Sequence, residues 1–266
     1  MRTDARLTAS LLLALAAGGV LADEIPESQR ILECVRDNMP SSPHVVAGKL
    51  KTRPLDAPQS APERIAFEAA LRDRDGSLSI SIIVTAPSDL AGSAYLFRQN
   101  PEQGQLHYYN PELDRVRRIR GGDGAAGIFG SALQLSDFDD IERTMRSASI
   151  TLHAAREADP AHHRRFTVLP AASAESPFGR IDMTVDTRRC FVIAAELTSP
   201  DGELTRRLRI PEEALERREA GFWYPQQLRI EDHTSGRRSE VVIERLRLPA
   251  QLPEARFSPE GFYRRD

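Results

Sequence analysis

Short segments in which apolar and polar residues alternate are the feature that most limits the fold of this chain. The clearest segment covers residues 78–85, where the apolar side chains of every second residue fall on one face. Alternation with a period of two is typical of a β-strand with one buried face. The predicted buried face carries Leu78, Ile80, Ile82 and Val84.

Similar segments recur along the chain, and the last of them covers residues 257–263. Turn signals separate the segments, and Pro200-Asp201-Gly202 is the strongest of these signals. We expect about ten or eleven strands, mostly antiparallel, because short links join antiparallel neighbours. A sheet of this size usually curls. We therefore predict a mainly β (α+β) fold, built on a curved, unclosed antiparallel β-sheet, or half-barrel.

A few helices are expected to cover the concave face of this sheet. Residues 26–39 carry apolar side chains at helical spacing, and Pro40 ends the pattern. Ser136 is an N-cap candidate for a second helix over residues 136–145. Residues 211–218 are predicted to form one or two helical turns.

The Gly-rich segment 121–127 is expected to act as a movable lid over the same face. It is followed by Ile128 and Phe129, whose apolar side chains would cover part of the sheet. Glycine-rich loops move easily, which suits a lid. An ordinary closed hydrophobic core is the alternative that these features leave open.

Residues 1–22 are predicted to be a secretory signal peptide. Two arginines precede an uncharged apolar run over residues 7–21, and Val20-Leu21-Ala22 suits signal peptidase cleavage. The apolar run is short for a bilayer span, although an uncleaved N-terminal anchor is the alternative. We therefore expect an exported domain of residues 23–266 that works outside the cytoplasm.

The sequence contains two cysteines, Cys34 and Cys190. An even pair in an oxidising compartment is a disulfide candidate. The bridge would join the helix at 26–39 to the strand that holds Cys190. Two buried free thiols are the alternative.

The sequence shows no local pattern that is typical of a catalytic, metal or cofactor site. It has no Gly-x-Ser-x-Gly motif. Segment 121–127 lacks the Lys-Ser/Thr ending of a phosphate-binding loop. His162 and His163 are adjacent and are expected to point apart, and no second His or Cys pair has zinc-binding spacing. We predict a protein that is not an enzyme and that needs no metal or cofactor.

The net charge of −3 argues against nucleic acid as the main partner.

Three segments carry a resemblance to a known family. Residues 108–119 read YYNPELDRVRRI, residues 129–138 read FGSALQLSDF, and Trp223-Tyr224-Pro225 precedes the last strands. Together they resemble the outer-membrane lipoprotein-sorting protein family, which has the LolA-like fold. The resemblance covers residues 26–263.

Two residues depart from the family pattern. Ala132 stands where the family usually has Asp, and Leu135 stands where it usually has Tyr. If those polar side chains tie the lid to the sheet, the tie is lost here. We therefore expect a lid that is looser or that binds differently.

The resemblance implies an apolar cavity for acyl chains in a periplasmic protein. On this basis we expect a carrier or chaperone for a lipid, or for the acyl chains of a lipoprotein, that serves transfer to or sorting at the outer membrane. A membrane transporter or an outer-membrane receptor is a further expected partner. The expected ligand contacts are Leu78, Ile80, Ile82, Val84, Ile128, Phe129 and Phe138. The alternative is that these residues belong to an ordinary closed hydrophobic core.

A periplasmic sensor or adaptor subunit of an export pump or regulatory system is the alternative function. Such a protein would bind its partner on the exterior, and the Arg-rich strand 115–120 is the candidate patch. A solvated face is the plainer interpretation of these arginines. An envelope hydrolase is a third and less favoured hypothesis.

Overall fold

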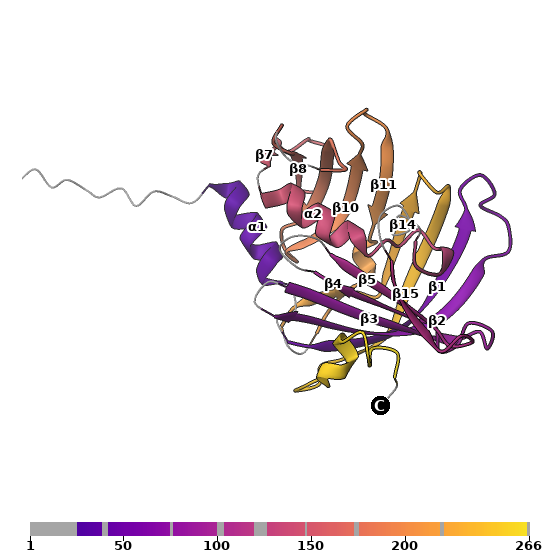
Figure 1. Cartoon of the computed structure of the whole chain (residues 1–266). Helices are drawn as coiled ribbons and strands as arrows, with labels where there is room; N and C mark the ends of the chain where they lie inside the picture. The colour runs from indigo at the N-terminus through magenta and orange to yellow at the C-terminus, as the bar shows by residue number, and fades with distance from the viewer. Residues whose placement is uncertain are drawn as a thin grey trace, which may run out of the picture.

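Thirteen strands lie side by side in one antiparallel sheet that bends into an open half-barrel (Figure 1). The structure is a computed structural model that describes residues 26–38, 42–74, 77–99, 104–119, 127–146, 148–172, 176–218 and 221–264. The predicted signal peptide, residues 1–22, lies outside these ranges, so its assignment stays a prediction. None of the described helices is long and apolar enough to cross a membrane.

The described elements are two α-helices, three short 3-10 helices and fifteen strands. The helices are α1 (Glu27–Asp37), η2 (Ile128–Gly130), α2 (Ser136–Arg146), η3 (Glu212–Ala214) and η4 (Glu254–Phe257). The strands are β1 (His44–Pro54), β2 (Glu63–Arg74), β3 (Ser77–Ala86), β4 (Ala94–Arg98), β5 (Gln105–Asn110), β6 (Arg115–Ile119), β7 (Ser149–Leu152), β8 (His163–Leu169), β9 (Arg180–Asp186), β10 (Phe191–Thr198), β11 (Leu204–Arg209), β12 (Leu215–Arg217), β13 (Trp223–Pro225), β14 (Gln227–Asp232) and β15 (Arg237–Arg247).

The order of the strands in the large sheet is β6-β5-β4-β3-β2-β1-β15-β14-β11-β10-β9-β8-β7, and β12 pairs with β13 separately. The predicted curved, unclosed antiparallel sheet is confirmed. Its thirteen strands exceed the expected ten or eleven. The two halves of the sheet are called here the first half (β1–β6 with β15) and the second half (β7–β11 with β14).

One connection crosses the hollow of the half-barrel. β6 and β7 follow one another in the chain but form the two opposite edges of the sheet. Of the chain between them, the described residues 127–146 lie on the concave side, and α2 runs inside the curve of the strands (Figure 1). We call residues 127–146 the crossover segment and its first part, residues 127–135, the lid segment. Residues 121–126 of the predicted Gly-rich lid lie outside the described ranges, so movement of the lid stays a prediction. The lid segment covers the first half, and α2 covers the second.

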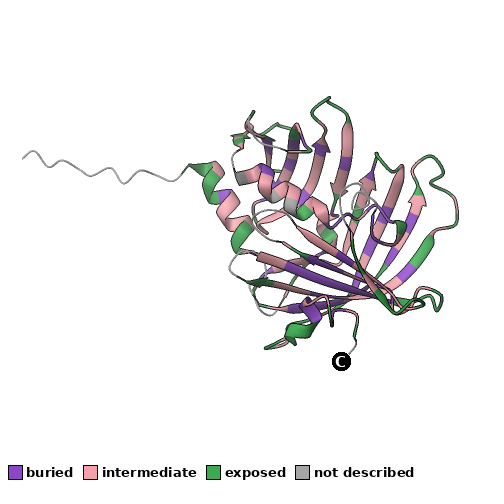
Figure 2. Cartoon of the chain, in the orientation of Figure 1, coloured by how far each residue is buried: buried purple, intermediate pink, exposed green. Residues whose placement is uncertain are grey.

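The concave face of the first half is an apolar cluster closed by the lid segment. Alternate residues of β1, β2, β3 and β4 meet there, and the inner surfaces of these strands are largely buried (Figure 2). Ile128 and Leu135 from the lid segment complete the cluster, with exposures of 3% and 2%. Its buried sheet residues are Val46, Leu50, Ile65, Ala69, Ile80, Ile82, Val84, Phe97, Val241 and Ile243.

The concave face of the second half is covered by the two α-helices. Ile31 of α1 and Ile141 of α2 pack on the apolar residues of β8, β9 and β10, of which Phe166 and Val185 are fully buried. Helix α1 is also held by the disulfide between Cys34 and Cys190, whose Cα atoms are 5.3 Å apart. The predicted disulfide is confirmed, and Cys190 lies in the turn just before β10.

The C-terminal segment covers the convex face of the first half. Phe262 packs on Ile83 and Leu96, and the Arg72 guanidinium lies 4.2 Å from the centre of the Phe257 ring. The predicted strand at 257–263 is wrong, because η4 and a series of turns occupy this region. Pro259 has no N–H to donate to a strand partner, which favours turns over a sheet edge.

Candidate functional site

Six of the seven predicted ligand contacts lie together on the concave face of the first half. Ile80, Ile82 and Val84 are buried there beside Ile128, and Leu78 and Phe129 pack at the margin of the same cluster. The seventh, Phe138, lies on α2 with 42% of its surface exposed. The strand and lid residues thus share one surface, whereas their role in binding stays a prediction.

The lid segment is a tight turn that leaves no room for a side chain at Gly127. The backbone N–H of Ile128 donates to the carbonyl oxygen of Leu133 at 2.9 Å. A Cβ at Gly127 would lie 1.6 Å from the carbonyl oxygen of Ser131, so only glycine fits. The Phe129 ring meets the Tyr95 ring edge to face at 4.8 Å. This contact, together with Ile128, covers the concave side of the apolar cluster.

Polar contacts fasten the lid segment to the strands beneath it. The backbone N–H of Ala132 donates to Ser239 Oγ at 2.9 Å, and that oxygen pairs with Thr52 Oγ1 at 2.8 Å. Gln134 Nε2 donates to Asp232 Oδ2 at 3.1 Å. Ala132 and Leu135 are both buried, and other groups bind the lid segment to the strands, so the expectation of a looser lid stays a prediction.

A buried ionic cluster anchors the start of α2. Arg206 Nη1 donates to Asp232 Oδ1 at 2.6 Å, and Arg206 Nε lies 3.4 Å from Asp137 Oδ2. Burial raises the pKa of Asp137 to about 6, even though the Arg206 charge acts to lower it. The crossover segment is thus held at a point where one proton can change the charge balance near neutral pH.

Three leucines form a partly exposed margin of the concave cluster. Leu71, Leu78 and Leu106 are intermediate in exposure and pack against the buried core residues. They lie towards the β2–β3 hairpin end of the sheet, on strands whose inner faces are otherwise apolar. Apolar surface that is exposed to solvent gives the acyl chain of a ligand a place to make first contact.

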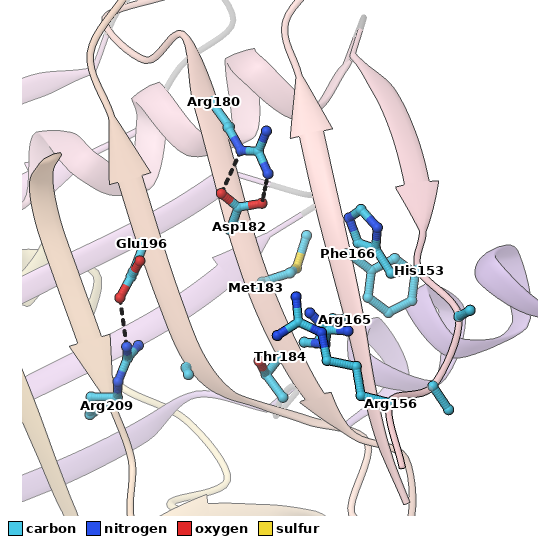
Figure 3. A pocket seen from close by; sticks show the side chains of 13 residues that line it. His153, Arg156, Arg165, Phe166, Arg180, Asp182, Met183, Thr184, Glu196 and Arg209 are labelled. Atoms are coloured by element: carbon cyan, nitrogen blue, oxygen red, sulfur yellow. Dashed lines mark hydrogen bonds and ion pairs between the residues drawn. The ribbon is translucent and has the colours of Figure 1, made fainter. Parts of the chain in front are cut away.

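The convex face of the second half carries a polar cavity of about 760 Å³ (Figure 3). Four arginines line it, and the three that come from β8, β9 and β11 have carboxylate partners. Arg180 binds Asp182, Arg209 binds Glu196 at 2.6 Å, and Arg165 binds Asp159 at 3.0 Å. Because these charges are largely compensated within the protein, the cavity is a weak candidate for ligand binding.

A second polar group brings His162 and His163 together. Their ring centres are 4.5 Å apart, and their Nε2 atoms lie 3.2 and 2.8 Å from the two oxygens of Glu212. The prediction that these rings point apart is wrong, because His162 lies in the turn before β8 and strand alternation does not apply to it. The pKa of Glu212 is lowered: burial acts to raise it, but hydrogen bonds from His162 and Arg189 and the charge of His163 outweigh burial.

The sequence did not indicate the ionic anchor of α2 or the His162–Glu212 group. Their members come from separate strands and turns, and pairing between β11 and β14 is what brings Arg206 to Asp232. The one available signal was weak: both Arg206 and Asp232 interrupt the inward apolar pattern of their strands.

The fold is shared with solved structures of low sequence identity. An outer-membrane lipoprotein-sorting protein domain from Vibrio parahaemolyticus has a TM-score of 0.72 and 16% identity, with 89% of this chain and 100% of that chain covered. A DUF1329 family protein from Desulfovibrio piger has a TM-score of 0.72 and 18% identity over 86% of this chain and 95% of that chain. A LolA superfamily protein from Nitrosomonas europaea has a TM-score of 0.62 and 16% identity, with coverage of 86% and 96%.

No curated protein matches the sequence. A family model described as an uncharacterized protein matches residues 77–264, which is more than half of the chain. The protein therefore belongs to this family of uncharacterized proteins, and the LolA-like fold that its sequence predicts is confirmed.

Proposed function

We propose that this protein is a periplasmic, non-enzymatic carrier or chaperone for a lipid, or for the acyl chains of a lipoprotein. The observation that carries the proposal is the concave apolar face of the first half, closed by the lid segment instead of by a second sheet. A cover made of a turn can move without breaking a strand pairing. The chain's own signal-peptide pattern supports export, and the fold shared with a lipoprotein-sorting domain supports the cargo class.

Binding would exchange the lid side chains for an acyl chain. An acyl chain with a dozen CH₂ groups gains roughly 10 kcal/mol when it leaves water, at about 0.8 kcal/mol for each group. Re-exposure of Ile128 and Phe129 would cost about 1.5–3 kcal/mol for each side chain. The balance favours the ligand, and the remainder must also offset the entropy lost on association. The margin of Leu71, Leu78 and Leu106 is the proposed point of entry.

The direct test is native mass spectrometry of the protein purified from its own periplasm. A carrier is expected to retain a lipid or a lipidated peptide whose mass is released on unfolding. The same protein, stripped of lipid, is expected to bind a fluorescent fatty acid with saturation. A chain that purifies without lipid and shows no saturable probe binding contradicts the proposal.

A matched pair of variants locates the site. Leu78→Glu places a charge at the partly exposed margin, and we expect probe affinity to fall at least about tenfold, since burial of an unpaired carboxylate is costly. Leu113→Glu changes a residue that is 70% exposed at the β5–β6 turn and leaves the concave face intact. Equal affinities in the two variants would place binding elsewhere.

An adaptor function is the second candidate, and the position of β6 favours it. β6 is an edge of the sheet, and Arg115, Arg117 and Arg118 on it are exposed. An edge strand offers unpaired backbone groups to an extended segment of a partner. Replacement of these three arginines by Glu is expected to abolish capture of an envelope partner while probe binding stays unchanged. Capture of the partner that survives this replacement would contradict the adaptor function.

A further inference from the structure

We propose that His162, His163 and Glu212 form a binding site for a divalent transition-metal ion, with Zn²⁺ as the best match. One ligand atom from each residue can be chosen so that all three lie within 4.8 Å of one another. Two imidazoles and one carboxylate are a ligand set that zinc uses, with a fourth position left for water or another ligand. This site is separate from the concave face and does not depend on the proposed carrier function.

The two polar contacts of His162 Nε2 cannot both be hydrogen bonds at the same time. Its Nε2 lies 3.2 Å from Glu212 Oε2 and 2.7 Å from Arg188 Nη2. A single ring nitrogen cannot donate a proton to the carboxylate and accept one from the guanidinium at the same time. A metal ion accepts the lone pairs of both imidazoles and of the carboxylate, and so replaces a conflicting set of contacts with a consistent one.

Two of the three ligand residues, His162 and Glu212, are held in place by their surroundings. The backbone N–H and the hydroxyl of Thr187 both donate to the carbonyl oxygen of His162 at 2.9 Å. Arg189 joins Glu212, at 3.0 Å, to the fully buried Asp186. Groups that orient ligands in this way are the usual supports of a metal site.

Two arginines oppose the charge of an ion, and they do so unequally. Arg189 is committed to Asp186 and lies 5.2 Å from the centre of the Trp223 ring. The Arg188 side chain is 60% exposed and can turn away into solvent when an ion binds. Removal of the Arg188 charge should therefore strengthen metal binding.

The test is equilibrium dialysis of the purified protein against Zn²⁺, followed by elemental analysis. The absorption spectrum of the protein with bound Co²⁺ reports on the ligand atoms. We expect one ion per chain. His163→Ala should weaken Zn²⁺ binding at least about tenfold, since even changes to groups behind the ligands cost this much. Arg188→Ala should tighten it severalfold. His153→Ala, at a histidine that pairs with Thr167 outside the site, should change nothing.

Glu212→Gln provides a variant that keeps the shape of the side chain and loses its charge. It is expected to weaken Zn²⁺ binding while its circular dichroism spectrum stays that of the parent protein. Absence of saturable Zn²⁺ binding, or an affinity that neither His163→Ala nor Glu212→Gln changes, overturns the proposal. A Co²⁺ spectrum without the visible bands of nitrogen and oxygen coordination would overturn it as well.

Discussion

The two halves of the sheet are covered in different ways. In the first half a turn closes the concave face, and its ties to the strands include one backbone N–H and one glutamine side chain. In the second half two helices close the same face, and a disulfide fixes one of them. Regions with few and local ties open at lower free energy than regions held by large packed elements. The difference predicts that the cover of the first half opens more readily than the cover of the second half.

Loss of the Asp232 carboxylate should have the largest effect on the stability of the crossover segment. Asp232→Ala leaves the Arg206 charge buried and removes the Gln134 tie, so we expect a loss of about 3–5 kcal/mol in the free energy of unfolding. Urea denaturation measures the loss, and hydrogen exchange should show it first in residues 127–146. Asp201→Ala, in an exposed turn, is the control. A stability equal to that of the control would show that the anchor is unimportant.

Removal of the disulfide should weaken the second half specifically. We expect the double variant Cys34→Ser/Cys190→Ser to lose about 2–5 kcal/mol, since the bridge closes a long loop in the unfolded chain. Hydrogen exchange should report faster opening of α1, with the first half still protected. Uniform loss of protection across both halves would contradict the division drawn here.

The charge of Asp137 should make the lid end of the molecule sensitive to pH. Its folded pKa of about 6 lies above the unfolded value of 3.8, so its favourable contribution is complete below the unfolded pKa and is lost as the pH rises through about 6. Asp137→Asn stays neutral, and we expect it to gain up to about 3 kcal/mol over the parent protein between pH 4 and pH 7. Thermal unfolding at both pH values measures this difference. A difference in stability between the two proteins that is the same at pH 4 and pH 7 would contradict this prediction.

The convex face of the second half should tolerate change best. Glu196 pairs with Arg207 and Arg209 on this partly exposed surface. We expect Glu196→Gln to cost less than about 1 kcal/mol, because exposed ion pairs contribute little. A larger loss in urea denaturation would mean that the charged face is as important to stability as the helices on the other side.

The sequence predicted the faces of strands better than their partners. The alternation at residues 78–85 correctly places Ile80, Ile82 and Val84 on a buried inner face, because side-chain direction follows from a period of two. Nothing local indicated that β15 returns to pair with β1, since that pairing joins residues almost two hundred positions apart. The same limit hid the anchor of α2, which depends on the register of β11 and β14.

Two errors came from applying strand rules where no strand exists. His162 precedes β8, and its ring therefore turns to the same side as that of His163. The aromatic residues Phe257 and Phe262 suggested a strand, yet they pack on the convex face from a 3-10 helix and a turn. Hydrophobic residues at similar spacing satisfy either geometry, and the proline and glycine between them decide the outcome.

The crossover segment has a geometric consequence for the whole molecule. Because residues 127–146 lie between the two edge strands in the chain, they cross the curved sheet as a chord crosses an arc. A change in the curvature of the arc alters the separation of its ends, and the chord must lengthen, shift or rise to follow. Any ligand that widened the hollow would therefore pull on its own cover, so that filling and opening would be a single movement.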